Sequence, residues 1–315
     1  MKLNYDNGCQ VLSGIIILLH YTIPTEETSM QYAVTLPNMN YDLRTLVELA
    51  RDAEASGWDG VFVWDCINMD DKATHDPWVM MSAIAATTQR VRIGPMITPL
   101  SRRRPWKLAR ETVTLDHLSH GRVVLPVGLG ETNDGGFKNV GEALERKTRA
   151  KMLDESLDIL TGLWSGQPFS YDGEHYHVQE MTFMPQPVQS PRIPIWVVGA
   201  WPRKKSLARA LRYDGILPAK MNEDSSFADM TPDDIRELCA YIDEHRPPSA
   251  SSTRYDIVYE GETPGDDAVR AADIVQPLAE AGVTWWLEAV WSKPETEGGA
   301  EGMRRRIRQG PPRVG

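Results

Sequence analysis

The sequence is poor in cysteine, in positive charge and in long apolar runs. Its three cysteines, Cys9, Cys66 and Cys239, form no CxxC pair and are odd in number, so we expect a cytoplasmic, reducing compartment and no structural disulfide. The formal net charge of −10 argues against a nucleic-acid partner, because phosphate binding needs a basic excess. The apolar run Ile15–Leu19 is too short to span a bilayer, so no membrane association is expected.

Several motifs of common enzyme classes are also missing. The chain has no GxSxG elbow, no HExxH and no P-loop. The segment Val127–Gly130 resembles the start of GxGxxG, but Asn133 stands where the third glycine belongs, which argues against dinucleotide binding. His175 and His177 alternate in an expected strand near Asp172, yet a third well-placed ligand is lacking, so we expect no metal site.

The first 29 residues differ from the rest of the chain. A signal peptide is disfavoured because Lys2 is the only basic residue before the apolar run and no small-x-small cleavage site follows. Met30 opens the first expected strand directly, with the sequence MQYAVTLP. We therefore expect residues 1–29 to be a poorly packed extension or the product of a misassigned start. Residues 30–315 show no second core and are expected to form one domain.

From Met30 onward, short runs rich in Val and Ile alternate with longer segments of helical period. This pattern indicates parallel strands joined by crossover helices. The predicted strands cover residues 32–36, 60–64, 92–96, 123–127, 195–198, 215–218, 256–259 and 285–289. The predicted helices cover residues 43–56, 76–88, 105–119, 142–164, 204–213, 233–245, 266–281 and 299–309. Eight strands, each followed by a helix, predict an α/β fold of the (β/α)8 TIM-barrel type.

One insertion, residues 165–191, interrupts this rhythm after the helix that follows the fourth strand. It contains FSYDGEHYHV, in which Asp172 and Gly173 separate alternating aromatic residues and predict a hairpin with a two-residue turn. Pro95 and Pro126 fall within predicted strands. Because proline donates no ladder hydrogen bond, both are expected at bulges or strand ends.

Ligands of parallel α/β barrels bind at the carboxyl ends of the strands. Gly128 and Gly130 end the fourth strand, where they form either a tight turn or a backbone that a flat ring can approach closely. Glu131 follows as a candidate acid or base, unless it is merely solvated. Asp65 follows the second strand, where it either binds a ligand or caps the next loop.

The exit of the fifth strand has the character of an anion site. Gly199 and Ala200 precede a helix whose first turn holds the basic residues 203–205. Cations in a first turn oppose the helix dipole, so they make more sense as anion contacts, and the backbone amides of Gly199 and Ala200 would suit a phosphate. Hydrated surface charge is the alternative, both here and for the basic run 102–104.

Several segments together resemble the luciferase-like monooxygenase family of flavin and deazaflavin oxidoreductases. They are VFVWD, RRRPWKLARETVTLDHLSHGRVVLPVGLG, GLWSGQPFSYDGEHYHV, IPIWVVG and YDGILP. The similarity covers nearly the whole chain from Met30. It implies a (β/α)8 barrel with an insertion after the fourth strand, and a cofactor lying across the strand ends. That cofactor is FMN or, alternatively, the deazaflavin coenzyme F420.

The resemblance also implies which residues bind the cofactor. They lie at the exits of the second to fifth strands and are Asp65, Met96, Ile97, Thr98, Gly128, Leu129, Gly130, Gly199, Ala200 and Trp201. Residues 96–98 match the stretch that packs against the flavin ring, often through a non-proline cis peptide, and residues 199–201 resemble the phosphate loop. Glu131 resembles a proton donor of some deazaflavin members. The catalytic candidates are thus Asp65, Cys66 and Glu131.

The activity implied by the resemblance is that of a flavin-dependent oxidoreductase or monooxygenase. Reduced flavin would pass a hydride to a small organic substrate or activate oxygen on it, while the protein keeps the pocket dry. The alternatives are a deazaflavin-dependent reductase or dehydrogenase and a non-catalytic flavin-binding barrel. Cys66 favours the last of these, because many relatives have His at this position. A separate flavin reductase and a homodimer are further partners that the family admits.

Overall fold

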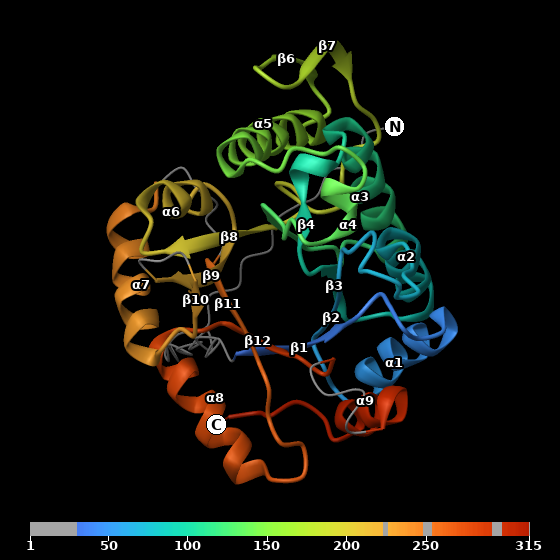
Figure 1. The fold of residues 1–315 in the computed structure, drawn as a ribbon, viewed down its shortest axis with the longest axis vertical. Helices are drawn as coiled ribbons and strands as arrows, with labels where there is room; N and C mark the ends of the chain where they lie inside the picture. Colours follow the sequence, from blue (N-terminus) through green and yellow to red (C-terminus); the bar gives the residue numbers. More distant parts are fainter. Residues whose placement is uncertain (1–29, 223–225, 248–253, 292–297, 315) are drawn as a thin grey trace, which may run out of the picture.

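Parallel strands surround a central axis in the computed structural model, which describes residues 30–222, 226–247, 254–291 and 298–314 (Figure 1). The strands are β1 Gln31–Leu36, β2 Gly60–Val63, β3 Arg92–Pro95, β4 Thr98–Pro99, β5 Leu125–Gly128, β8 Ile195–Trp201, β9 Gly215–Met221, β11 Asp256–Gly261 and β12 Trp285–Glu288. Their order around the sheet is β3, β2, β1, β12, β11, β9, β8, β5 and β4. Every neighbouring pair in this order is parallel.

The two ends of this order meet beside β5. The backbone amide of Ile93 donates to the carbonyl of Arg122 at 3.0 Å, and the amide of Val124 donates to the carbonyl of Ile93 at 2.9 Å. β4 continues the third strand beyond a cis peptide between Met96 and Ile97, as the resemblance implies. The fold is therefore a nearly closed parallel barrel, which confirms the predicted fold class.

Helices cover the outside of the barrel (Figure 1). They are α1 Leu43–Ala55, α2 Pro77–Thr87, α3 Pro105–Ser119, α4 Gly135–Lys138, α5 Arg146–Trp164, α6 Lys204–Ala210, α7 Pro232–His245, α8 Ala268–Ala281 and α9 Gly299–Arg308, with a short 3-10 turn η1 at Leu100–Arg102. The side chain of Asp76 caps α2 by accepting from the amide of Val79 at 2.9 Å, and Pro77 opens that helix. Among the described residues, no helix has both the length and the apolar character of a membrane span.

Large side chains fill the lower part of the barrel interior. The buried interior cluster consists of Ala33, Phe62, Val124, Trp196, Leu217, Val258, Trp285 and Leu287. The rings of Phe62 and Trp285 each lie 5.3 Å from the ring of Trp196, centroid to centroid. Gly94 makes room for them, because a Cβ there would lie 2.9 Å from the Phe62 ring and 2.4 Å from the carbonyl of Val124. Any cavity must therefore lie between these side chains and the carboxyl ends of the strands.

The structure corrects some details of the predicted elements. The insertion does form a hairpin, β6 Pro168–Asp172 with β7 His177–Thr182, but residues 173–176 separate the strands instead of a two-residue turn. The short helix α4 follows the β5 loop, where no helix was predicted, and β9 extends to Met221 to pair with β10 Phe227–Ala228. Pro95 ends β3 as expected, whereas Pro126 lies inside β5. The predicted extension 1–29 lies outside the described residues.

Candidate active site

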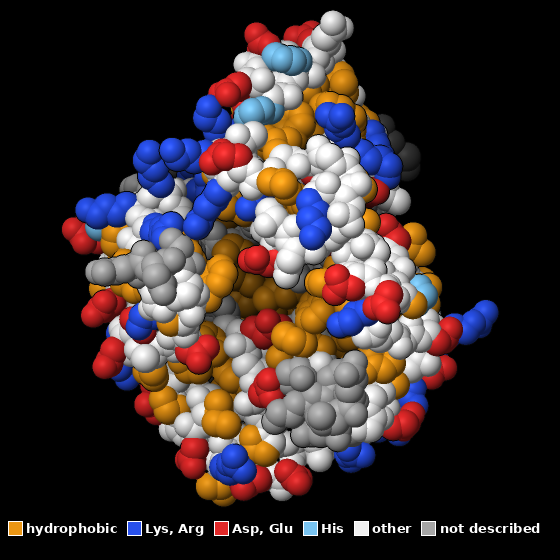
Figure 2. Space-filling model, in the orientation of Figure 1, with side chains coloured by type: hydrophobic (Ala, Val, Ile, Leu, Met, Phe, Trp, Pro, Cys, Tyr) orange, Lys and Arg blue, Asp and Glu red, His pale blue; other side chains and the backbone are white. Residues whose placement is uncertain are grey.

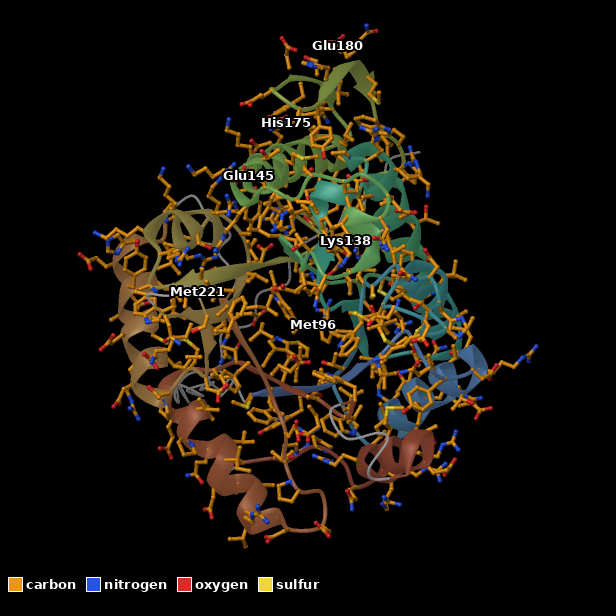
Figure 3. The ribbon with its side chains drawn as sticks, in the orientation of Figure 1. Met96, Lys138, Glu145, His175, Glu180 and Met221 are labelled. Carbon is orange, nitrogen blue, oxygen red and sulfur yellow. The ribbon has the colours of Figure 1, made fainter. Side chains whose placement is uncertain are left out.

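A cavity of about 560 Å³ opens at the carboxyl ends of the strands. Its wall is mostly apolar and consists of Trp64, Asp65, Cys66, Met69, Met96, Ile97, Pro99, Leu129, Gly130, Glu131, Asn133, Asp134, Arg146, Arg149, Leu153, Val198, Ala200, Ser206, Arg209, Ala219, Met221 and Phe227. Figure 2 shows a hollow with a hydrophobic floor, and Lys and Arg side chains gather at its upper-left edge, over α6 and the start of α5. Figure 3 places Met96 near the middle of the barrel and Met221 on its β9 side.

Asp65 is the centre of a buried ion-pair network. Its Oδ1 lies 2.6 Å from Nη2 of Arg103 and 3.1 Å from Nη2 of Arg102. Its Oδ2 accepts from the hydroxyl of Thr98 at 2.8 Å. The Asp65 side chain has no exposed surface. Burying a carboxylate is costly unless it is paired and hydrogen-bonded, and the two guanidinium groups with the hydroxyl satisfy this requirement.

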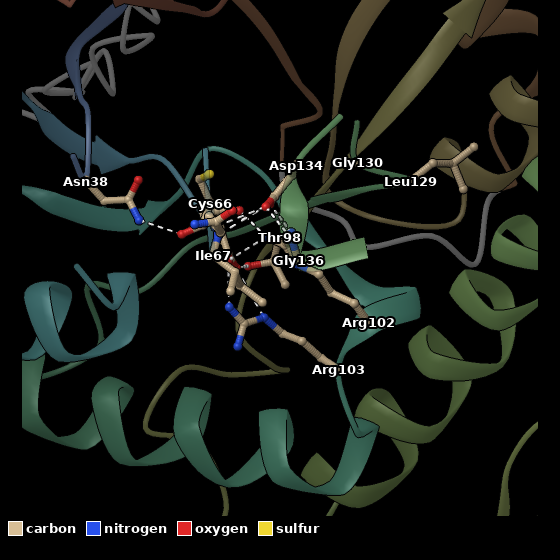
Figure 4. A network of polar contacts seen from close by, with 12 residues as sticks. Asn38, Cys66, Ile67, Thr98, Arg102, Arg103, Leu129, Gly130, Asp134 and Gly136 are labelled. Atoms are coloured by element: carbon tan, nitrogen blue, oxygen red, sulfur yellow. Dashed lines mark hydrogen bonds and ion pairs between the residues drawn. The ribbon is translucent and has the colours of Figure 1, made fainter. Parts of the chain in front are cut away.

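Asp134 joins the same network from the β5 side (Figure 4). It pairs with Nη1 of Arg102 and accepts from the backbone amides of Asn68 at 3.1 Å and Gly136 at 2.8 Å. Burial tends to raise the pKa of Asp134, but the hydrogen bonds from Arg102, Gly136 and Asn68 outweigh it, so the pKa lies below its ordinary value. Arg102 thus links the loop after β2 to the loop after β5, and the two loops form one rigid corner of the cavity.

A second buried arginine supports the β5 loop. Nη1 of Arg149 donates to the carbonyls of Leu129 at 2.8 Å and Gly130 at 2.7 Å. Its guanidinium lies 5.5 Å from the centre of the Phe137 ring, and that of Arg102 lies 5.1 Å from the same ring. Arg149 therefore holds the loop that carries the candidate Glu131, through hydrogen bonds to the loop carbonyls and packing on Phe137.

Cys66 faces the cavity as a neutral thiol. Burial and the neighbouring Asp134 carboxylate raise its pKa to about 11, and its side chain belongs to the cavity wall. The side-chain amide of Asn38 donates to the backbone carbonyl of Cys66 at 2.8 Å, which fixes the backbone at Cys66. A raised pKa disfavours the thiolate, which is the form of cysteine that acts as a nucleophile or proton acceptor.

The exit of β8 is arranged differently from the predicted phosphate loop. The backbone amide of Ala200 already donates to the hydroxyl of Ser206 at 2.9 Å. The basic residues 203–205 are exposed, and they are not part of the cavity wall. Arg209 does line the cavity, but Asp154 pairs with it. Of the other two cavity-lining cations, Arg149 donates to backbone carbonyls, and Arg146, exposed at the start of α5, forms no ion pair within the described residues.

The structure brings most of the predicted site residues to one cavity. Those in its wall are Asp65, Cys66, Met96, Ile97, Leu129, Gly130, Glu131 and Ala200. The described residues Thr98, Gly128, Gly199 and Trp201, also predicted to contact the cofactor, are not part of this wall. At Gly128 a Cβ would lie 2.8 Å from Ile97 and 3.0 Å from Val198, so neighbouring side chains occupy the space that was expected to admit a flat ring.

Sequence reasoning missed several residues of the site. Asp134, Arg149 and Ala219 were not predicted, and for the basic run 102–104 the alternatives were anion contacts and hydrated surface charge. Arg102 instead pairs with Asp65 and Asp134, and Arg103 pairs with Asp65. No local signal could have shown this, because Arg102 meets Asp65 and Asp134 across 37 and 32 residues of sequence.

The residues present fit a flavin-type group. The cavity volume lies within the range of ligand pockets, about 300 to 1,000 Å³, and an apolar wall with few polar groups is typical of such pockets. Met96, Ile97 and Val198 offer an apolar surface for a flat ring. Arg146 offers a positive charge for an acidic portion at the edge. The floor of the cavity is apolar, so a ring bound there would be shielded from water.

Comparison with known proteins gives a consistent picture. The model of a family described as luciferase-like monooxygenase matches residues 17–264. An F420-dependent glucose-6-phosphate dehydrogenase of Amycolatopsis mediterranei (strain U-32) is 33% identical over 163 residues, which cover 50% of this chain and 48% of that protein. The chain thus spans about half the length of the curated relatives it matches.

Solved structures share the fold at low sequence identity. An F420-dependent secondary alcohol dehydrogenase in complex with an F420-acetone adduct has a TM-score of 0.70 at 19% identity and covers 89% of this chain and 99% of its own. A coenzyme F420 dependent tetrahydromethanopterin reductase from Methanopyrus kandleri has a TM-score of 0.66 at 15% identity, with 89% and 97% covered. At these identities the likeness concerns the fold alone.

Proposed function

This chain belongs to the luciferase-like monooxygenase family, and from that premise we propose that it is an F420-dependent oxidoreductase acting on a small organic substrate. Support for F420 comes from the relative in Amycolatopsis mediterranei, whose name includes this coenzyme. FMN is the second candidate, since the family resemblance admits either cofactor. A non-catalytic cofactor-binding barrel is the third.

The observation that carries the proposal is the mostly apolar cavity at the strand exits. Asp65 from the loop after β2, Leu129 and Gly130 from the loop after β5, and Ala200 near the end of β8 converge on it, and its floor is hydrophobic (Figure 2). Arg146 offers a cation at the cavity edge, where it would meet the acidic tail of F420 or, alternatively, the phosphate of FMN. A closed, apolar floor also suits a redox group that must be protected from water.

When bound, F420 would supply a hydride donor or acceptor. The chain's own residues hold and shield the reactants. Arg102 and Arg103 fix the Asp65 corner through buried ion pairs, so the wall beside the ring does not need to rearrange. Met96 and Ile97 exclude water from the floor. Glu131 lies exposed at the cavity edge, where it is the candidate to exchange a proton with solvent.

Cofactor retention tests the proposal. Purified protein is incubated with F420 or with FMN and passed through gel filtration, and F420 is expected to co-elute. Arg146→Glu should weaken binding of the retained cofactor by about tenfold, because an acidic group of that cofactor would lose an ionic contact at the edge and meet a carboxylate instead. Lys147→Glu, the exposed neighbour outside the cavity wall, is the matched control.

The outcomes separate the candidates. Retention of FMN without F420 would favour the FMN-dependent reading, and retention of neither would overturn the proposal. The non-catalytic reading is tested by mixing the loaded protein, in its reduced form, with a panel of ketones and aldehydes and following the cofactor's absorbance. Reoxidation in the absence of oxygen contradicts that reading.

A further inference from the structure

The β9–β10 pair places two large apolar side chains at the mouth of the cavity. Phe227 of β10 lies directly opposite Met221 of β9 in this antiparallel pair, so the two side chains share one face. Both residues line the cavity, as does Ala219, which precedes Met221 by two residues and therefore lies on the same face of β9. Met221 is 8% exposed and Phe227 is 64% exposed, so the Phe227 ring is available to contact a molecule in the cavity.

Two further apolar side chains approach the cavity from the opposite side of the barrel. In one direction around the barrel, β2 is followed by β1, β12, β11 and β9; in the other, it is followed by β3 with its continuation β4, then by β5, β8 and β9. β2 and β9 are therefore on opposite sides. Trp64 and Met69 follow β2, are half-buried and line the cavity. Together with Met221 and Phe227 they form the apolar rim.

Protein groups already engage the charged side chains in the buried part of the wall. The carboxylates of Asp65 and Asp134 are held in the ion-pair network described above. Nη2 of Arg209 lies 2.8 Å from Oδ2 of Asp154. Arg149 donates to two backbone carbonyls of the β5 loop. These groups have partners within the protein and do not depend on a ligand for compensation.

The other charged side chains of the described wall are Arg146 and Glu131, and both are exposed at its edge. An ionised ligand at the apolar rim would thus lose its hydration without gaining a charged partner, which is costly. The thioethers of Met69 and Met221 and the rings of Trp64 and Phe227 instead favour contact with an apolar ring. Charge and shape therefore select for the same kind of molecule.

We propose that the apolar rim recognises the substrate and that this substrate is an uncharged, apolar ring compound. The inference rests on the proposed oxidoreductase function and deepens it by naming the substrate class. The cofactor ring is assigned to the apolar surface at Met96, Ile97 and Val198, which leaves the apolar rim for the substrate. Ionic compounds, phosphorylated sugars among them, are expected to bind poorly at the rim.

Fluorine-19 NMR tests the inference by binding, without turnover. 1-Fluoronaphthalene is the uncharged probe, 4-fluoro-1-naphthoate carries a carboxylate on the same ring system, and 2-deoxy-2-fluoroglucose 6-phosphate is the sugar phosphate. Each is titrated into wild-type protein with and without saturating F420. The variants are Phe227→Ala and Met69→Ala, one from each side of the cavity. Val269→Ala, at an exposed apolar residue of α8 outside the cavity wall, is the matched control, and circular dichroism verifies folding.

We expect wild type to bind 1-fluoronaphthalene about tenfold more tightly than either anionic probe, and F420 should not displace it. Phe227→Ala should weaken its binding about tenfold and Met69→Ala about threefold, because each variant removes apolar contact area, whereas Val269→Ala should match wild type. The inference is overturned if the naphthoate binds as tightly as 1-fluoronaphthalene, if F420 displaces the uncharged probe, or if either rim variant binds that probe like wild type.

Failure of the inference is distinguishable from failure of the proposed function. Retention of F420 on gel filtration is scored on the same samples. A wild type that retains F420 but binds the anionic probes as tightly as the uncharged one contradicts only the substrate class. A wild type that does not retain F420 contradicts the proposed function, and the cofactor-free titrations still decide whether the apolar rim selects uncharged compounds.

Discussion

At the scale of single residues, Asp65 shows how one carboxylate organises the corner of the site. It meets two arginines and the Thr98 hydroxyl in a position without solvent contact. Breaking one partner of a buried ion pair costs more than the pair contributes, because the remaining charge stays buried without compensation. Asp65 therefore holds the neighbouring loops in position and stabilises the fold.

Asp65→Asn should lower the free energy of unfolding by about 3 kcal/mol, since Arg102 would keep its buried charge with half of its compensation lost. Urea denaturation of the purified variant measures the loss. Asp172→Asn, which removes an exposed pair with His177, is the control and should leave the midpoint unchanged. A loss below about 1 kcal/mol in Asp65→Asn would contradict the structural role assigned to the network.

Cys66 should react slowly with alkylating reagents. Burial raises its pKa to about 11, so the thiolate fraction at pH 8 is about a hundredfold below that of an ordinary thiol. Labelling with iodoacetamide under native conditions, followed by mass spectrometry of the Cys66 peptide, measures this rate. It should rise steadily as the pH approaches 11. Labelling at the rate of free cysteine would show that the thiol is neither buried nor neutral.

The sequence indicated the place of these residues better than their partners. Asp65 and Glu131 were found because they follow apolar strands, and strand exits share one face of a barrel. The pairing of Asp65 with Arg102 and Arg103 could not be predicted, because it depends on two loops meeting in space. The crowding around Gly128 could not be predicted for the same reason, since Ile97 and Val198 from neighbouring strands occupy the space beside it.

At the scale of elements, the β6–β7 hairpin is tied to α5 by one carboxylate. Glu155 accepts from the backbone amides of Glu174 at 3.0 Å and Tyr176 at 3.0 Å, and from that of His175 between them. This anchoring explains why residues 173–176 form the turn. Alternating aromatic residues predicted the hairpin itself, but the turn length depends on a helix about 20 residues earlier in the chain.

Glu155→Ala should loosen the hairpin while leaving the barrel folded. Three amides would lose their acceptor, so hydrogen exchange of residues 174–176 should accelerate by at least tenfold, and the unfolding free energy should fall by about 1 to 3 kcal/mol. Hydrogen–deuterium exchange read by mass spectrometry measures the first effect. Glu174→Ala, which removes an exposed pair with Lys151 and a long contact with His175 but no acceptor of the turn amides, is the control and should leave the turn protected.

At the scale of the whole molecule, the alternation of strands and helices was sufficient to predict the barrel. A local apolar run predicts each strand, and a local helical period predicts each crossover helix. The order of strands and helices along the chain can therefore be predicted without long-range information. The near-closure beside β5 and the contents of the cavity do need it. Met221 and Phe227, for example, reach the wall because β9 is longer than its apolar run and pairs with β10.

The central claim is that the cavity at the strand exits holds a flavin-type cofactor. Equilibrium binding of F420 to wild type, Ala219→Trp and Ala208→Trp tests it most directly, because Ala219 lines the cavity while Ala208 is exposed on α6. The account predicts that wild type and Ala208→Trp bind alike, and that Ala219→Trp, with thermal unfolding showing that it is folded, loses binding by at least a hundredfold. Equal binding by all three proteins would contradict the placement of the cofactor in this cavity.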